Sequence, residues 1–266
     1  MIGLIDCLKA AGTAVNLGDL KIHLACWNGH EHPIDVYYAG RFKEWQEWQT
    51  RRNFNCEHIL GLIDLGQPNW LFAGVFKVLG SKQNADGGYK YSTQLLPGQE
   101  DMIGRIIVHH KRTRQSYIWY EPAIALPIVE IRRQKLTIEE FPGYNAVILS
   151  HSKLKIIVEQ RIPSWHAALA NVKGIYLITD TATGRHYVGK ASGEVGIWQR
   201  WCSYAKNGHG GNVELRQLLD RVGHDQMRNF QYSILEIADT HACDADILER
   251  ESYWMKALRS RGLGLN

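Results

Sequence analysis

A change of hydrophobic pattern near residue 170 constrains the fold of this chain more than any other feature of its sequence. Between residues 21 and 145, short segments alternate apolar and polar residues and are separated by turns rich in Gly, Pro and Asn, a pattern typical of β-strands. After residue 173, predicted strands alternate with predicted helices up to residue 266, which is typical of a small α/β domain. A chain of 266 residues has room for two such domains.

We predict a mixed α/β (α+β) chain with a β-rich domain over residues 1–150, a helical linker over 151–171 and an α/β domain over 172–266. The β-rich domain fits a small barrel that carries one or two helices. The linker helix carries an apolar stripe, formed by Leu154, Ile157, Val158 and Ile162, and is interrupted at Pro163 because proline removes a backbone donor. In the last domain we expect a three-stranded antiparallel sheet flanked by helices, with strands over 174–180, 185–189 and 230–237 and helices over 196–206, 212–222 and 244–259.

The composition excludes several classes of protein. Apolar residues make up 45% and charged residues 22% of the chain, so a packed core is expected and wholesale disorder is excluded. No segment approaches the roughly 18 apolar residues that a membrane span needs, so no membrane partner is expected. The five cysteines are scattered without a C-x-x-C motif, and the N-terminus carries no secretory pattern. These features exclude a zinc ribbon and predict a cytoplasmic protein.

The charge balance permits nucleic-acid binding without indicating it, because 31 basic and 27 acidic residues give a net charge of only +4. One segment, residues 105–114, concentrates cations and contains no acidic residue. Its candidate DNA-binding residues are Arg105, Lys111, Arg112 and Arg114. Two interpretations stay open for this segment, contact with backbone phosphates and a solvated hairpin arm. The aromatic run over residues 117–120 could stack on a base, although core packing is the commoner use of such rings.

A hairpin predicted over residues 174–189 brings two tyrosines together. If residues 181–184 form its loop, Tyr176 lies opposite Gly189 on the neighbouring strand. Because side chains alternate between the faces of a sheet, Tyr176 and Tyr187 then lie on one face as diagonal neighbours. Two tyrosines in this arrangement are packing residues in most sheets, so the pair does not define a site by itself.

The last predicted helix carries a carboxylate on its apolar face. Leu248, Glu251, Met255 and Leu258 form one stripe at helical spacing. An ionised carboxylate that faces the domain is costly unless it meets a cation or a metal ion. An ion pair with Arg200, an edge position that reaches water and a divalent metal would each satisfy Glu251, and the sequence leaves the three open.

Three further residues complete a candidate site. Arg200 and Tyr204 lie one turn apart on the helix that follows the hairpin, and Lys190 lies at the end of the second strand. The guanidinium fork of Arg200 either presents donors to a phosphate or extends into solvent without a role. The two tyrosines of the hairpin, the two cations and the carboxylate suit phosphodiester cleavage with one divalent metal better than acyl or glycosyl transfer. The sequence contains no Walker loop, G-x-G-x-x-G, H-E-x-x-H or G-x-S-x-G motif.

Residues 172–266 resemble the GIY-YIG nuclease superfamily. The two name-giving motifs stand here as Gly174-Ile175-Tyr176 and Tyr187-Val188-Gly189, followed in order by Lys190, Arg200, Tyr204, the Glu-Arg-Glu run at 249–251 and Asn266. The last helix is similar to that of phage intron-homing endonucleases, whereas the Lys–Arg–Tyr set is closer to the repair type. No family is recognised in the first 165 residues.

The resemblance implies a metal-dependent DNA endonuclease. The catalytic residues that it implies are Tyr176, Tyr187, Lys190, Arg200, Tyr204, Glu251 and Asn266, with Glu251 as the ligand of Mg²⁺ (or Mn²⁺). One tyrosine would take the proton of the attacking water. A phenol with a pKa near 10 is a poor base, so we expect a cation such as Lys190 to favour its phenolate.

We therefore expect DNA as the partner and a restriction or phage-defence role, with target recognition by the first domain. A homodimer would suit cleavage of both strands. A structure-specific repair or recombination nuclease is the alternative, and a non-catalytic nucleic-acid-binding protein is a further one that the complete set of site residues disfavours. The first role is favoured because a self-contained β-rich domain is fused to the nuclease.

Overall fold

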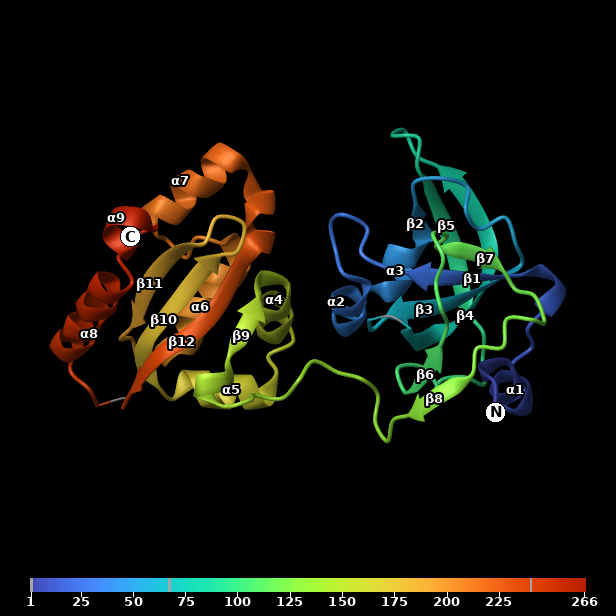
Figure 1. Cartoon of the computed structure of the whole chain (residues 1–266), viewed down its shortest axis with the longest axis horizontal. Coiled ribbons are helices and arrows are strands. Elements are labelled where there is room, and N and C mark those ends of the chain that lie inside the picture. The colour runs from blue at the N-terminus through green and yellow to red at the C-terminus, as the bar shows by residue number, and fades with distance from the viewer. Residues whose placement is uncertain (1, 67, 240) are drawn as a thin grey trace. The chain divides into compact units, whose positions relative to one another are not determined.

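A computed structural model describes residues 2–66, 68–239 and 241–266 and divides the chain into two compact units, Met1–Thr137 and Ile138–Asn266 (Figure 1). Both units combine helices with strands, so the predicted mixed α/β class is confirmed. Among the described residues, no helix has both the length and the apolar character that a membrane crossing requires. The two compact units are unit 1 and unit 2, in chain order.

Unit 1 is built on a curled, mixed sheet. Its strands are β1 (Leu20–Ala25), β2 (Trp48–Gln49), β3 (His58–Asp64), β4 (Asn69–Gln83), β5 (Tyr89–Leu95), β6 (Ile106–His109), β7 (Tyr117–Trp119) and β8 (Ile128–Ile131). In the described part of the chain they form one sheet in the order β2-β5-β4-β3-β1-β7, with β6 pairing with both β4 and β8. The strands β1 and β3 are parallel, and the sheet curls into a half-barrel.

Apolar residues on both faces of the central strands supply the core of unit 1, because β3 and the first half of β4 are buried at nearly every position. Side chains alternate between the two faces, so Leu60 and Phe72 belong to one buried cluster and Ile63 and Leu71 to another. Three short helices accompany the sheet, α1 (Leu4–Ala10), α2 (Pro33–Tyr38) and α3 (Phe42–Glu47), together with a 3₁₀ turn, η1 (Leu17–Asp19). The predicted mostly-β unit is confirmed.

A titratable side chain, His23, lies inside this core and is 2% exposed. Its ring stacks on Tyr117 with 4.9 Å between centroids, and its Nδ1 lies 3.1 Å from Oε1 of Gln46. Burial lowers the pKa of His23 from 6.5 to about 4, and the hydrogen bond to Gln46 acts against the shift. The unfolded chain therefore binds the proton more tightly than the folded unit does. The stability that neutral His23 contributes is complete above pH 6.5 and is lost as the pH falls toward 4.

We expect His23→Gln to flatten the pH dependence of stability in unit 1. Between pH 7 and pH 5, the free energy of unfolding of the parent should fall by about 2 kcal/mol more than that of the variant. Urea denaturation followed by tryptophan fluorescence measures this difference. His224→Gln, at an exposed position of unit 2, should follow the parent, and equal pH slopes for His23→Gln and the parent would contradict the shift.

Unit 2 is built on an antiparallel sheet that, in the described residues, has the strand order β11-β10-β12-β9. Its strands are β9 (Ile148–Ser150), β10 (Lys173–Asp180), β11 (Arg185–Ala191) and β12 (Phe230–Ala238). Its helices are α4 (His151–Glu159), α5 (Pro163–Ala170), α6 (Gly196–Asn207), α7 (Val213–Val222), α8 (Asp244–Ala257) and α9 (Ser260–Leu263), with 3₁₀ turns η2 (Tyr144–Ala146) and η3 (His224–Asn229). The three predicted strands are present, and β9 adds a fourth at the edge next to β12.

The units divide at residue 137 rather than at 150, and residues 151–171 are part of unit 2 rather than a linker. The strand β9 pairs with β12, which attaches the chain before α4 to the sheet. Leu154 and Ile157 of the apolar stripe are fully buried on α4, which packs against α6. Trp165 of α5 is fully buried and donates its indole N–H to the Glu139 carbonyl over 2.8 Å. An amphipathic helix predicts a buried face, and in the structure that face packs into the core of unit 2.

Candidate active site

The hairpin of β10 and β11 has the predicted register, with Tyr176 opposite Gly189 and Ile178 opposite Tyr187. The two tyrosine rings lie on one face of the sheet with their centroids 6.5 Å apart. A Cβ atom built on Gly189 would lie 2.5 Å from the Tyr176 ring. Because Gly189 has no side chain, the ring of Tyr176 can lie over the neighbouring strand at this position.

We expect Gly189→Ala to displace Tyr176, since 2.5 Å is far shorter than any van der Waals contact. The free energy of unfolding should fall by about 1–3 kcal/mol, as for other overpacked cores, and any activity that depends on the tyrosine pair should fall with it. Denaturation and a DNA cleavage assay measure the two effects. Gly262→Ala is the matched control because no atom lies within 4 Å of its added methyl group. Unchanged stability and rate in Gly189→Ala would contradict this packing.

Helix α6 brings Arg200 and Tyr204 to the same face of the sheet. Trp201 and Tyr204 are fully buried and fix the helix against the sheet. The hydroxyls of Tyr176 and Tyr204 lie 3.0 Å apart. Arg200 donates from Nε to the Tyr176 hydroxyl and from Nη2 to the Tyr204 hydroxyl, each over 3.3 Å, and from Nη1 to the Gly210 carbonyl over 3.4 Å. The guanidinium of Arg200 is thus held at the tyrosine cluster and does not extend freely into solvent.

Burial controls the tyrosine electrostatics. It raises the pKa of the Tyr176 hydroxyl above its ordinary value of 10, Tyr187 adds to the rise, and Arg200 lowers it. Burial also raises the pKa of Tyr204. Both hydroxyls are therefore neutral near pH 7, where they can donate and accept hydrogen bonds. The cation that contacts Tyr176 is Arg200 and not Lys190, the residue that we expected to favour a phenolate.

Lys190 lies on the other face of the sheet. It follows Tyr187 by three residues on β11 and pairs with Ile175, and alternation places it opposite to the tyrosines. Helix α8 covers this second face, where Ile175, Val188 and Ile247 form a buried cluster. The charge of Lys190 lowers the pKa of Glu251. The structure thus groups Lys190 with the carboxylate rather than with the phenols.

Glu251 is half-buried on the inner side of α8, as the sequence predicts. The observed apolar stripe of α8 differs from the predicted one in its first residue. Ile247 is 1% exposed, whereas Leu248, the residue that we expected to begin the stripe, is 51% exposed. Burial raises the pKa of Glu251, and Lys190 and then Arg200 lower it. Within the described residues Glu251 forms no ion pair within 4.0 Å, so the alternative of an Arg200–Glu251 salt bridge is not formed.

The residues present suit a hard cation better than zinc. Within residues 2–66, 68–239 and 241–266 there is no group of three or more His, Cys, Asp or Glu side chains that could hold a metal ion. Structural and catalytic zinc needs three or four such ligands. Mg²⁺ commonly binds through one or two carboxylates together with waters and substrate phosphates. The carboxylate of Glu251, which has a backbone hydrogen bond to Lys190 but no ion pair among the described residues, fits that second pattern.

Asn266 contacts the backbone of β11. Its Nδ2 donates to the Val188 carbonyl over 2.6 Å, and its Oδ1 accepts from the Val188 N–H over 2.8 Å. Since β11 is an edge strand, these two bonds satisfy part of its free edge next to Tyr187. In this structure Asn266 positions the strand that carries the second motif.

Two further residues belong to the tyrosine cluster and were not predicted. Tyr232 of β12 is fully buried, with its ring 6.1 Å from that of Tyr204, and its hydroxyl lies 3.0 Å from Nδ1 of His151. Gly210 has a φ of +54°, and a Cβ there would lie 2.6 Å from the Tyr204 ring. No motif marks Tyr232, whereas the Gly-Gly pair at 210–211 is a sequence signal for a positive φ.

In unit 1 the basic segment is a loop between strands that do not pair with each other. Strand β6 pairs with β4 and β8, and β7 pairs with β1, so the predicted hairpin arm is not formed. Arg105 precedes β6 and donates to two backbone carbonyls, and Arg112 donates to the Ser116 hydroxyl over 2.9 Å. Lys111 and Arg114 are exposed. The structure therefore separates Arg105 from the three cations of the loop.

The aromatic run after the loop divides between core and surface. Tyr117 stacks on His23 and donates its hydroxyl to Oε1 of Gln49 over 2.6 Å. Trp119 is 45% exposed, with Nζ of Lys21 4.6 Å from the centroid of its ring. Of these rings, Trp119 is the exposed one, and Lys21 lies over it.

Comparisons with known proteins concern about a third of the chain. No protein-family model and no curated protein matches the sequence. Two solved structures are similar to part of it, and both are catalytic domains of a homing endonuclease. One is the catalytic domain of the homing endonuclease I-TevI, with 31% identity over 35% of this chain and 96% of that one and a TM-score of 0.28. The other is a single-site mutant of the same intron-endonuclease domain, with 29% identity over 36% and 92% and a TM-score of 0.29.

Proposed function

We propose that unit 2 is an endonuclease domain of the GIY-YIG type that hydrolyses phosphodiester bonds in DNA. The observation that carries the proposal is the guanidinium of Arg200, which two buried hydroxyls hold in place. The half-buried Glu251, which lacks an ion pair among the described residues, lies close enough for Arg200 to lower its pKa. A guanidinium held in place beside a half-buried carboxylate that forms no ion pair is unfavourable for packing alone, and the two groups suit a phosphate and a metal ion.

In this proposal each residue has a distinct task. Arg200 donates to phosphate oxygens and stabilises the charge that develops there. Tyr187 is 7% exposed, whereas Tyr176 is fully buried, so Tyr187 is the tyrosine that a water molecule would reach. Its hydroxyl would orient that water, and Tyr176 would hold Arg200 in register. Glu251 would bind Mg²⁺ or Mn²⁺, which supplies charge stabilisation to the leaving oxygen when bound.

We further propose a restriction or phage-defence role in which unit 1 recognises the target, and a homodimer where both strands are cut. Support comes from unit 1 being a separate compact unit with its own core. A specific interface with DNA buries on the order of 1,000 Å² or more, so a small nuclease unit gains specificity from an attached domain. The second candidate is a structure-specific nuclease, which the same site chemistry supports.

The test is a cleavage panel with the full chain. Methylated and unmethylated plasmids, flaps and single strands are incubated with Mg²⁺ or with EDTA, alongside Glu251→Gln prepared in the same way. We expect Mg²⁺-dependent cutting of duplex DNA by the parent and none by the variant. Cutting confined to flaps would favour the repair alternative, and cutting that persists in EDTA or in the variant would contradict the proposal.

We expect the loop cations of unit 1 to contact backbone phosphates. Replacing Lys111, Arg112 and Arg114 together by Gln should weaken binding on all DNA sequences alike and lower the slope of log K against log salt by up to about three. Fluorescence anisotropy across a salt series measures both quantities. The matched control replaces three exposed lysines elsewhere in unit 1, Lys9, Lys82 and Lys135. An unchanged slope in the loop variant would make the segment a solvated loop.

A further inference from the structure

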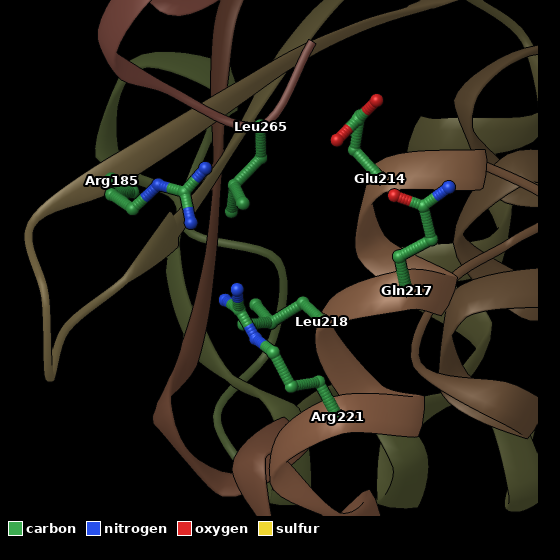
Figure 2. A pocket seen from close by; sticks show the side chains of 6 residues that line it. All are labelled: Arg185, Glu214, Gln217, Leu218, Arg221 and Leu265. Carbon is green, nitrogen blue, oxygen red and sulfur yellow. The ribbon is translucent and has the colours of Figure 1, made fainter.

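Unit 2 contains a cavity of about 210 Å³ between helix α7 and the start of strand β11, many times the room that one water molecule needs. Its lining residues are Arg185, Glu214, Gln217, Leu218, Arg221 and Leu265. Figure 2 shows the guanidinium groups of Arg185 and Arg221 directed into the same space. Neither the sequence motifs nor the proposed catalysis uses any of these six residues.

The charges of the cavity favour an anion. Arg185 is fixed by a hydrogen bond from Nη2 to the Gly264 carbonyl. Neither Arg185 nor Arg221 forms an ion pair with a carboxylate in the part of the chain that the structure describes. The carboxylate of Glu214 lies apart from both guanidinium groups (Figure 2). Two guanidinium groups that face one space repel each other unless an anion lies between them. Phosphate matches their fork geometry.

The cavity lies on the same side of the sheet as the tyrosine cluster. Arg185 precedes Tyr187 by two residues on β11, so their side chains share one face at a separation of about 7 Å. Leu218, which lines the cavity, belongs to the buried side of α7. A strand of DNA carries a phosphate for every 3.4 Å or so of helix axis. Since phosphates recur at this short interval, a strand that runs along this face from Arg200 to Arg185 places one of its phosphates at the cavity.

We propose that this cavity binds a backbone phosphate of the DNA strand, next to the phosphate that is cleaved. The inference rests on the proposed function, because it takes DNA as the substrate of unit 2. Arg185 is the fixed half of the phosphate site and Arg221, which is exposed, is its adjustable half. Gln217 adds neutral donors, and the negative charge of Glu214 opposes the bound phosphate.

The first experiment tests the phosphate site without DNA. In the full chain, inorganic phosphate should raise the midpoint of thermal unfolding more than sodium chloride of equal ionic strength. Arg221→Gln should lose this difference. Arg216→Gln, which removes the same charge from α7 at an exposed position outside the cavity lining, should keep it. An equal phosphate effect in the parent and in Arg221→Gln would overturn the site.

The second experiment tests the assignment to DNA by anisotropy with a duplex in EDTA. Arg221→Gln should weaken binding 3- to 10-fold and lower the salt slope by about one, whereas Glu214→Gln should tighten binding a few-fold. If the parent cleaves DNA and Arg221→Gln binds it like the parent, the cavity proposal is wrong and the proposed function stands. If Arg221→Gln loses the phosphate effect but the parent neither binds nor cleaves DNA, the assignment to DNA is wrong.

Discussion

Glu251→Gln should abolish DNA cleavage while leaving DNA affinity within a few-fold of the parent. The substitution removes the negative charge that would hold Mg²⁺ and keeps the shape of the side chain, so the protein surface that meets DNA is unchanged. We expect the rate to fall by at least about three orders of magnitude, since the leaving oxygen loses its charge stabilisation. Single-turnover cleavage at saturating Mg²⁺ and anisotropy in EDTA measure the two quantities.

The same substitution should raise the stability of unit 2 slightly. Burial raises the pKa of Glu251, which means that the fold disfavours the ionised form. Above that raised pKa the folded and unfolded states both carry the charge, and a neutral Gln removes the cost of burying it. Glu249→Gln, on the exposed side of α8, should change neither stability nor rate. Retained Mg²⁺-dependent cleavage in Glu251→Gln would remove the residue from the role of metal ligand.

The hairpin register could be predicted from sequence because a four-residue loop fixes which residues pair. Once Tyr176 is opposite Gly189, alternation determines the faces of all other positions on both strands. The same rule shows that Lys190, three residues after Tyr187, lies on the far face. The role expected for Lys190 beside the phenols came from the family resemblance, and the parity of its position was the signal against it.

The position of Glu251 was predicted correctly from a stripe that was partly wrong. A stripe that begins at Ile247 and one that begins at Leu248 both contain Glu251. Ile247 and Leu248 are neighbours in the sequence and both are apolar, so the pattern alone does not choose between them. The cluster with Ile175 and Val188 on the sheet selects Ile247, and only tertiary packing supplies that choice. Sequence periodicity therefore fixes the inner side of a helix to within about one residue.

The boundary between the units could not be predicted from local pattern. Strand β9 has three residues, too few for a periodicity, and its pairing with β12 joins segments about 80 residues apart in the sequence. The stripe of α4 predicted a buried face without saying which core would cover it. In the structure that core belongs to unit 2, so unit 2 begins at residue 138.

Arg200→Ala should lower the cleavage rate by two or more orders of magnitude, which corresponds to the loss of a transition-state donor worth about 3 kcal/mol. The structure shows why one residue has so large an effect. Two tyrosine hydroxyls and the Gly210 carbonyl accept from three different nitrogens of Arg200, so the guanidinium needs no reorganisation when a phosphate arrives. Single-turnover rates at saturating DNA measure the effect, and the thermal midpoint shows whether the variant is folded.

Arg200→Lys and Tyr204→Phe separate the charge of Arg200 from its placement. Lysine keeps the charge but is a point donor that cannot reach both hydroxyls and a phosphate at once, so it should restore the rate only in part. Tyr204→Phe removes one acceptor of the guanidinium and keeps the ring that packs on Gly210, so it should reduce the rate less than Arg200→Ala does and should leave DNA affinity unchanged. If Arg200→Lys is as active as the parent, a single cation is enough at this site. The fork geometry, and with it the reason for two buried tyrosine hydroxyls, would then have no part in the reaction.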